Sequence, residues 1–310
     1  MDRSALSPGT GGNPSTGDNG LATNAGLACA CEVALGTDAK VYVADYMSVR
    51  MLTPTGTPIY PGPSFEVNGV VNASAFGTAA QLALGSWVEI HGSYLAPDSR
   101  TWTGADFSDI TAPTSLDGTS VTIGGQPAFI SYISAGQVNA QVPTNIGSGA
   151  QQLVVTTTYG KTANYTITVN GVLPRLLAPP SFSFNSIQYA VALFSDGATY
   201  VLPSGAIPGV PSRPATVGDT ITLYGIGFGS VTPNNPAGQI VQGNNSLDLP
   251  FTAKIGAMPA TVLYAGLAPG AIGLYQFNIV VPKVTATGAL PFSFTLGGVA
   301  GPQTLYISIK

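Results

Sequence analysis

Two stretches that lie 133 residues apart decide the fold. The first is Gly85-Ser-Trp-Val-Glu-Ile-His-Gly92, and the second is Gly218-Asp-Thr-Ile-Thr-Leu-Tyr-Gly225. Aliphatic residues recur at every second position, as at Val88 and Ile90 in the first stretch. A period of two is typical of a β-strand with one buried face, and the bounding glycines mark turns.

The same matching continues along the chain in the same order. Ile123-Gly-Gly-Gln-Pro-Ala128 corresponds to Ile255-Gly-Ala-Met-Pro-Ala260, and Gln137-Val-Asn139 corresponds to Gln276-Phe-Asn278. The offset grows by seven before the last pair, and these seven additional residues of the second copy follow Tyr264. Such ordered matches predict two copies of one domain, which we expect to superpose with the Gln-x-Asn pairs in equivalent positions.

The composition favours strands over helices. Of the 310 residues, 39 are Gly and 25 are Pro, and both types interrupt helices. Short strands with turn signals about every ten residues fit an immunoglobulin-like sandwich. We therefore predict an all-β chain with an N-terminal arm and a small meander (1–69), a first immunoglobulin-like domain (70–172), and a second one with an inserted hairpin (173–310).

The N-terminal region differs from the two copies. Residues 7–26 are turn-formers, so we expect an extended arm there. The meander is predicted from three β-prone runs, at 31–35, 41–45 and 49–52. A proline-rich linker is expected at 54–63.

Charge excludes several functions. Asp, Glu, Lys and Arg make up 8% of the chain, against roughly 25% in an average domain. With 10 Lys and Arg and a net charge of -4, we expect no nucleic-acid partner and no polybasic membrane patch. The sequence contains no run of 18 apolar residues, so we predict no membrane-spanning helix. The N-terminus does not resemble a signal peptide, which fits a mature product or an excerpt of a longer chain, and we still expect an extracellular location.

Some of these stretches resemble known families. The pattern at 218–229 resembles the opening of IPT/TIG-type immunoglobulin-like domains, and residues 70–310 look like the tandem C-terminal module of secreted acidobacterial, Solibacter-type proteins. Residues 17–27, 41–45 and 50–56 together look like one NHL repeat. In that family several NHL repeats form propeller blades, whereas a single repeat cannot close a propeller. The resemblance implies a secreted, non-catalytic context.

Candidate catalytic residues are scarce. His91 is the only histidine, and it stands where the second copy has Tyr224, so we expect a packing or surface role. No Ser lies in a Gly-x-Ser-x-Gly elbow. The glycines at 225–229 lack the spacing of a phosphate loop and predict a strand that ends in a tight turn. A carboxylate pair for glycoside cleavage is identified by the distance between its two carboxyl groups, which the sequence does not give. No pair of Asp or Glu residues stands out in the sequence. We predict no enzyme, no catalytic residue and no cofactor.

Cys29 and Cys31 are separated by one residue. In a regular strand their Cα atoms would lie about 6.5 to 7 Å apart, at the limit of disulfide reach. Three alternatives remain for this pair: two free buried thiols, disulfides to another chain, or metal ligands together with His91.

Acidic and glycosylation-type positions complete the candidates. One long loop of the first copy contains Asp98, Asp106, Asp109 and Asp117. Their carboxylates would supply part of a hard-cation site, but the spacing matches no calcium loop, so we expect solvated acids and no metal. N-glycosylation-type sequons begin at Asn72, Asn164 and Asn244.

Two functions fit this sequence. The first is an extracellular structural protein, a homopolymer that forms a fibre or surface assembly through its N-terminal segment. A mean hydropathy of +0.30 and the unpaired edges expected for the meander favour self-association. The alternative is a carbohydrate-binding or adhesive module with a polysaccharide partner, in which exposed aromatic residues among the 13 Tyr and the 2 Trp (Trp87 and Trp102) form a sugar-binding platform.

Overall fold

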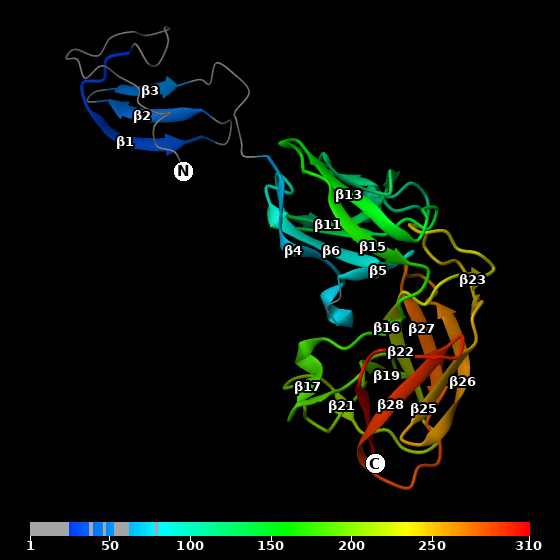
Figure 1. Cartoon of the computed structure of the whole chain (residues 1–310). Helices are drawn as coiled ribbons and strands as arrows, with labels where there is room; N and C mark the ends of the chain where they lie inside the picture. Colours follow the sequence, from blue (N-terminus) through cyan, green and yellow to red (C-terminus); the bar gives the residue numbers. More distant parts are fainter. Residues whose placement is uncertain (1–24, 37–39, 46–47, 53–61, 78–79) are drawn as a thin grey trace. The chain divides into compact units, whose positions relative to one another are not determined.

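β-Strands account for nearly all regular structure in this chain, as predicted (Figure 1). The computed structural model describes residues 25–36, 40–45, 48–52, 62–77 and 80–310. The chain divides into two units, Met1–Tyr60 and Pro61–Lys310. Apart from their last two residues, the arm at 7–26 and the linker at 54–63 lie outside the described residues.

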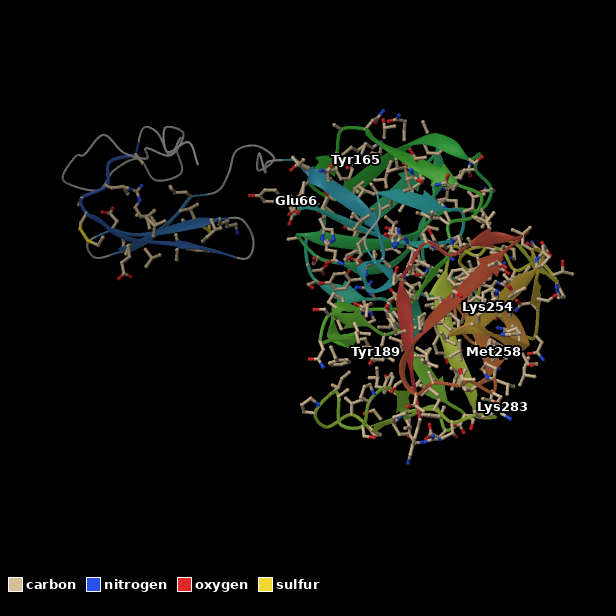
Figure 2. The ribbon with its side chains drawn as sticks, turned by 60° about the horizontal axis from the view of Figure 1, so that its bottom comes forward. Glu66, Tyr165, Tyr189, Lys254, Met258 and Lys283 are labelled. Atoms are coloured by element: carbon tan, nitrogen blue, oxygen red, sulfur yellow. A yellow bond between two sulfur atoms is a disulfide. The ribbon has the colours of Figure 1, made fainter. Side chains whose placement is uncertain are left out.

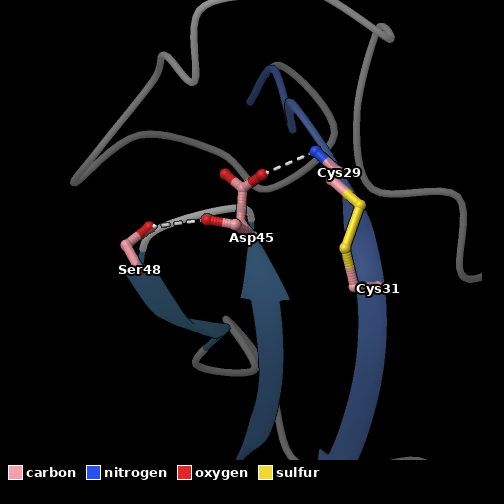
Figure 3. The surroundings of a disulfide bond; sticks show 4 residues. All are labelled: Cys29, Cys31, Asp45 and Ser48. Atoms are coloured by element: carbon pink, nitrogen blue, oxygen red, sulfur yellow. Dashed lines mark hydrogen bonds between the residues drawn. A yellow bond between two sulfur atoms is a disulfide. The ribbon is translucent and has the colours of Figure 1, made fainter.

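The first unit contains an antiparallel meander, ordered β1-β2-β3. Its strands are β1 (Ala30–Leu35), β2 (Val41–Asp45) and β3 (Ser48–Leu52). Val43 and Asp45 of the central strand are buried, and the Asp45 carboxylate accepts a hydrogen bond from the backbone N–H of Cys29 at 2.9 Å (Figure 3). The three predicted strands are confirmed.

Cys29 and Cys31 form a disulfide with each other, which corrects all three alternatives for this pair (Figure 3). The pairing of β1 with β2 shifts its register between Ala30 and Glu32, so Cys31 occupies an irregular position in the strand. A bulge bends the strand, and the two Cα atoms lie 5.4 Å apart, closer than in a regular strand. Neither sulfur is left for another chain or for a metal.

The first sandwich of the second unit has two sheets. Its strands are β4 (Ser64–Asn72), β5 (Gln81–Ala83), β6 (Trp87–Ser93), β7 (Arg100–Thr101), β8 (Ser115–Leu116), β9 (Thr119–Ile123), β10 (Gln126–Pro127), β11 (Phe129–Ile133), β12 (Gln137–Gln141), β13 (Gly149–Thr157), β14 (Gly160–Lys161) and β15 (Tyr165–Asn170). One sheet is ordered β4-β6-β12-β11-β7 and the other β10-β9-β13-β15-β5. Alternate residues such as Val88, Ile90, Val121 and Ile123 are buried in one core. The period of two therefore sorts each strand into a core face and an outer face.

The second sandwich has a larger, aromatic core, and its two layers are joined into one 11-stranded sheet because β26 pairs with both β27 and β25. Its strands are β16 (Arg175–Leu176), β17 (Ser183–Phe184), β18 (Ile187–Gln188), β19 (Ala192–Phe194), β20 (Tyr200–Val201), β21 (Ser212–Arg213), β22 (Thr220–Ile226), β23 (Val231–Thr232), β24 (Ser246–Leu247), β25 (Phe251–Ile255), β26 (Met258–Leu267), β27 (Tyr275–Val280), β28 (Gly288–Leu296), β29 (Val299–Ala300) and β30 (Leu305–Ile309). Phe228 follows β22 between two positive-φ glycines, and its ring lies 4.5 Å from that of Phe277. The predicted strand end is confirmed at Ile226, whereas residues 227–230 adopt an extended connection without a hydrogen-bonded turn.

The hairpin predicted as an insertion in the second domain corresponds to two short hairpins. β17 pairs with β18, and β19 pairs with β20. The turn of the second hairpin is closed by Asp196, whose carboxylate accepts the backbone N–H groups of Ala198 and Thr199. Asp196 is followed by Gly197, and Asp-Gly is a frequent pair at hairpin turns.

The internal repeat is confirmed by strand order and register. β4-β6-β12-β11 in the first sandwich corresponds to β19-β22-β27-β26 in the second. Asn139 faces Glu89 across the strands just as Asn278 faces Thr222. In both copies the Gln side chain donates to the Asn side chain two residues later, at 2.8 Å and 3.0 Å.

Candidate ligand-binding site

The outer face of β6 and β12 carries a row of polar and aromatic side chains. Because Val88 and Ile90 point into the core, the residues that alternate with them on β6 point away from it. The cross-strand pairs on this face are Trp87 with Gln141, Glu89 with Asn139, and His91 with Gln137.

Both tryptophans lie at one end of this face. Their rings are 5.5 Å apart and nearly perpendicular, at 79°. Trp102 also makes an edge contact with Phe107 at 5.1 Å and packs against the core of the first sandwich. Trp87 Nε1 donates a 2.9 Å hydrogen bond to the carbonyl of Ile272 in the second sandwich. These contacts hold both indoles in position.

The two sandwiches border an open cavity of about 340 Å³, which we call the junction cavity. The second sandwich contributes Ala271, Ile272 and Leu274 to its lining, and the first sandwich contributes Ala73, Phe76, Trp87, Val88, Glu89, Trp102, Ser131 and Asn139. Most of this lining is apolar, and the polar side chains are few. Its volume lies at the small end of the range for ligand pockets, roughly 300 to 1,000 Å³.

A β-bulge brings Ser131 into this lining. Ile130 pairs with Ala140 and Tyr132 pairs with Asn139, so Ser131 is the additional residue of β11. Bulges re-aim side chains at sites of this kind. The second copy has the same bulge at Leu263, where the residue is apolar.

Four of the seven additional residues of the second copy lengthen the loop between β26 and β27, which is 268–274 where the first copy has 134–136, and the other three extend these two strands. The loop contributes Ala271, Ile272 and Leu274 to the cavity. Val241 pairs with this loop through backbone hydrogen bonds to residues 270 and 271, at 2.8 Å and 3.0 Å. The insertion that the sequence indicates therefore contributes residues to one wall of the junction cavity.

Gln141 ties the two sandwiches together beside the cavity. This buried side chain donates from Nε2 to the carbonyl of Gly85 at 2.8 Å and accepts the backbone N–H of Gly238 at 2.7 Å. Backbone bonds from Ala112 N to Gly238 O and from Ile240 N to Ile110 O, at 2.8 Å and 2.9 Å, add to the contact. The geometry of the junction is thus set by buried hydrogen bonds.

Among the described residues that line the cavity, Glu89 is the one with an ionisable side chain. Its carboxylate lies 3.4 Å from Nε2 of His91, and its side chain is 15% exposed. Asn139 Oδ1 accepts from Gln137, and within the described part of the chain its amide NH₂ makes no hydrogen bond. A carboxylate acceptor and an amide donor therefore lie side by side, next to two indoles.

A second hollow of about 610 Å³ lies on the other side of the loop 268–274. Gly273 and Tyr275 face it, whereas the alternate residues Ile272 and Leu274 face the junction cavity. Its lining combines amide and hydroxyl side chains with about as many apolar ones and with Asp248, and neither tryptophan contributes to it.

The acidic loop is organised around Arg100, which the sequence analysis missed. Arg100 donates to both oxygens of Asp106, at 2.9 Å and 3.0 Å, and to Asp117 through Nε and Nη2. These hydrogen bonds hold the pKa values of both carboxyls below their usual range and raise the pKa of Arg100. The basic partner was overlooked because a solitary Arg among acids shows no metal-ligand spacing.

The other predicted positions lie apart from the cavity. His91 is beside Glu89 but does not line the cavity. Asn72 is buried and donates to the carbonyl of Gly77 at 2.8 Å, so a glycan on it would not fit the folded sandwich. Asn164 and Asn244 are exposed, and their sequons remain predictions.

The described residues lack two kinds of feature. They contain no cluster of three or more His, Cys, Asp or Glu side chains arranged to hold a metal ion. They also contain no helix with the length and apolar character that a membrane crossing requires.

No family model and no curated protein matches this sequence. Among solved structures, SGBP-B of the Bacteroides ovatus mixed-linkage glucan utilization locus, in complex with a mixed-linkage heptasaccharide, is similar over 87% of this chain, with 10% identity and a TM-score of 0.34. The chain spans about half (52%) of the length of that protein. Domains 5–6 of the S-layer protein SbsC match 80% of this chain and 98% of their own length, with 12% identity and a TM-score of 0.26. The titin Ig tandem A164–A165 matches 74% of this chain and 90% of its own length, with 12% identity and a TM-score of 0.17. These are distant likenesses between tandem β-sandwich proteins.

Proposed function

We propose that this chain is a non-enzymatic, cell-surface carbohydrate-binding protein and that its ligand occupies the junction cavity. One observation carries the proposal: two nearly perpendicular indoles line a small open cavity whose polar side chains are Glu89, Ser131 and Asn139. A sugar ring presents an apolar C–H face and a rim of hydroxyls. Aromatic walls fit the face, and a few placed polar groups fit the hydroxyls.

The rigidity of the site supports binding. Trp87 is hydrogen-bonded to Ile272, and Trp102 is packed between Trp87 and Phe107. Side chains that are ordered before the ligand arrives lose little entropy on binding.

Calorimetric titration of the full chain tests this function. The probe is a mixed-linkage glucan heptasaccharide, the class of ligand in the Bacteroides ovatus complex, with a xyloglucan oligosaccharide as second probe. Trp102→Ala is expected to weaken binding by about 2 kcal/mol, roughly thirtyfold, as for a buried aromatic anchor.

Asn139→Ala and Asn278→Ala form a matched pair. Both asparagines accept a hydrogen bond from the Gln two residues earlier, but only Asn139 lines the cavity. We expect weaker binding for Asn139→Ala and unchanged binding for Asn278→Ala. Equal effects of the two substitutions, or no binding of any neutral glycan by the folded chain, would contradict the proposal.

Self-association through the meander is a second candidate function. Val33 and Leu35 of β1 are 67% and 77% exposed. Within the described residues, nothing pairs with the outer edges of β1 and β3. Exposed apolar side chains on an unpaired edge favour pairing with another chain, and a head-to-tail contact of this kind builds a fibre.

Light scattering tests the second candidate. Leu35→Lys is expected to reduce the particle mass to that of a monomer, as is deletion of residues 1–60. Val67→Lys is the control, because Val67 is 93% exposed on β4 of the second unit. A monomeric wild-type chain, or an assembly that survives both changes, would rule this function out.

A further inference from the structure

The second hollow, the space of about 610 Å³ on the other side of the loop 268–274, combines several features of a ligand site. We propose that it binds a second neutral sugar unit, independently of the junction cavity. The proposal rests on the proposed function and adds a second site for the same class of ligand. The volume lies well within the range of ligand pockets, roughly 300 to 1,000 Å³, and such pockets are frequent where domains meet.

Both sandwiches supply polar side chains to the second hollow. Thr144 lies between β12 and β13 of the first sandwich, and Asn234 and Asn235 lie between β23 and β24 of the second. Thr144 and Asn234 are exposed, and neither side chain forms a hydrogen bond within the described part of the chain. Asn235 donates from Nδ2 to the carbonyl of Gln239 at 3.2 Å, which leaves its Oδ1 atom as an acceptor. Donors and acceptors are therefore available to a ligand.

Buried hydrogen bonds hold the walls of the second hollow. Gln141 bonds to the backbone of Gly85 and Gly238. The hydroxyl of Tyr275 donates to the carbonyl of Gly229. The side chains of Gln141 and Tyr275 are both buried. Walls that are fixed before the ligand arrives reduce the entropy that binding costs.

Apolar surface lies beside these polar groups. Val172 and Leu249 line the second hollow, and each is 39% exposed. Val172 lies over Gly229, where a Cβ atom would come within 2.7 Å of Val172 Cγ1. Apolar surface with a polar rim is typical of ligand-binding grooves.

This mixture of groups matches a sugar unit. The C–H face of the ring packs against aliphatic surface, and each hydroxyl both donates and accepts hydrogen bonds. The Thr144 hydroxyl and the Asn234 amide bond to sugar hydroxyls in either role. Asp248 only accepts, because hydrogen bonds from Ser230 and Thr232 hold the pKa of its carboxyl below the usual range. An ionised carboxylate has about four acceptor positions, so positions remain for sugar hydroxyls.

The second hollow and the junction cavity are separate sites. Among the described residues, none lines both of them. Ile272 and Leu274 face the junction cavity, and Gly273 and Tyr275 face the second hollow, so one backbone segment forms the wall between the two. A polysaccharide that is held at one site is concentrated near the other, which strengthens its overall attachment.

NMR titration of the full chain with a mixed-linkage glucan trisaccharide tests the second site. The indole N–H signals of Trp87 and Trp102 report on the junction cavity, and the side-chain amide signals of Asn145 and Asn234 report on the second hollow. In the wild type we expect both groups of signals to shift to saturation. In Trp102→Ala we expect the dissociation constant at the second hollow to stay within about twofold of the wild-type value.

Matched substitutions identify the binding residues. Asn234→Ala is expected to weaken binding about tenfold, read at the Asn145 amide, and Asn244→Ala, at an exposed asparagine outside both sites, is expected to leave it unchanged. Val172→Ala is expected to weaken binding about fivefold. Its control is Met258→Ala, because Met258 is 41% exposed on β26 and lines neither site (Figure 2).

The titration separates this inference from the proposed function. Amide signals of the second hollow that stay unshifted while the indole signals saturate would overturn the inference and leave the proposed function intact. Amide shifts that vanish in Trp102→Ala would overturn it too, since one site would then account for both groups of signals. Indole signals that stay unshifted while the amide signals saturate would contradict the junction site and support the second hollow. Two unshifted groups would contradict both.

Discussion

At the scale of single residues, Gly270 and Gly273 lie in the same loop and differ in their surroundings. Both have positive φ, +79° and +63°. A Cβ at Gly270 would meet nothing within 4 Å, whereas a Cβ at Gly273 would overlap Gln141 Nε2 and lie 3.0 Å from the carbonyl of Gly85. Gly273 therefore permits the close approach of the two sandwiches.

Alanine substitutions separate backbone strain from the steric clash. Gly270→Ala is expected to cost about 1 kcal/mol, the cost of a left-handed residue with a Cβ. Gly273→Ala is expected to cost about 1 to 3 kcal/mol more, because the junction must also move. Denaturant unfolding of both variants measures the difference, and equal costs would contradict the tight contact at Gly273.

Arg100 is expected to control the titration of the acidic loop. Its hydrogen bonds lower the pKa values of Asp106 and Asp117, so the stabilisation is complete above the ordinary carboxyl pKa, near 4, and is lost as the pH falls through the lowered values. In Arg100→Leu the pKa of Asp106 is expected to rise towards its ordinary range. Carboxyl-carbon NMR reads this shift, and Arg213→Leu, in the second sandwich, is expected to leave Asp106 unchanged.

At the scale of elements, the loop 268–274 joins two sandwiches through backbone atoms. The Ile272 carbonyl holds the Trp87 indole, and β26 and β27 pair directly before and after the loop. The loop can therefore be shortened without removing the strands that precede and follow it.

Replacing residues 269–273 with Asn-Gly tests this role. A two-residue Asn-Gly turn is compatible with the hairpin, so both sandwiches are expected to fold. The Trp87 indole N–H loses its acceptor, and its hydrogen exchange is expected to accelerate. The chain has 2 Trp, so NMR can follow each indole. Ile272→Ala, which keeps the carbonyl, is expected to retain slow exchange, and slow exchange in the shortened loop would contradict the assignment.

At the scale of the whole molecule, side-chain hydrogen bonds join the two sandwiches of the second unit. Gln141 bonds to backbone groups in both sandwiches, and so does Gln303, which donates to the carbonyls of Phe76 and Leu176. Removing one partner of a buried hydrogen bond leaves the other unpaired, at about 1 to 3 kcal/mol each.

Gln141→Leu is expected to uncouple the two sandwiches. The wild-type second unit should unfold in one calorimetric transition, with equal calorimetric and van't Hoff enthalpies. In the variant the van't Hoff enthalpy is expected to fall below the calorimetric one. Gln137→Leu is the control on the same strand, because among the described residues its side chain bonds to Asn139 of the same sandwich and not across the junction. A single transition in Gln141→Leu would show that other junction contacts suffice.

The amino-acid sequence by itself determined the two sandwiches, their shared strand order and the meander. These features follow from local signals: a period of two buries one face of each strand, and Gly and Pro end it. The matched stretches of the two copies, including the Gln-x-Asn pairs, indicate the repeat. The change in their offset places the additional residues after Tyr264.

Only the tertiary structure decided what that loop does. Trp87 and Ile272 are separated by 185 residues, and no local pattern records a hydrogen bond between them. The Cys29–Cys31 disulfide depends on a bulge whose register is set by β2, a neighbouring strand. The cavity likewise exists because two independently predictable domains meet, and that meeting depends on side-chain shape, which sequence periodicity does not encode.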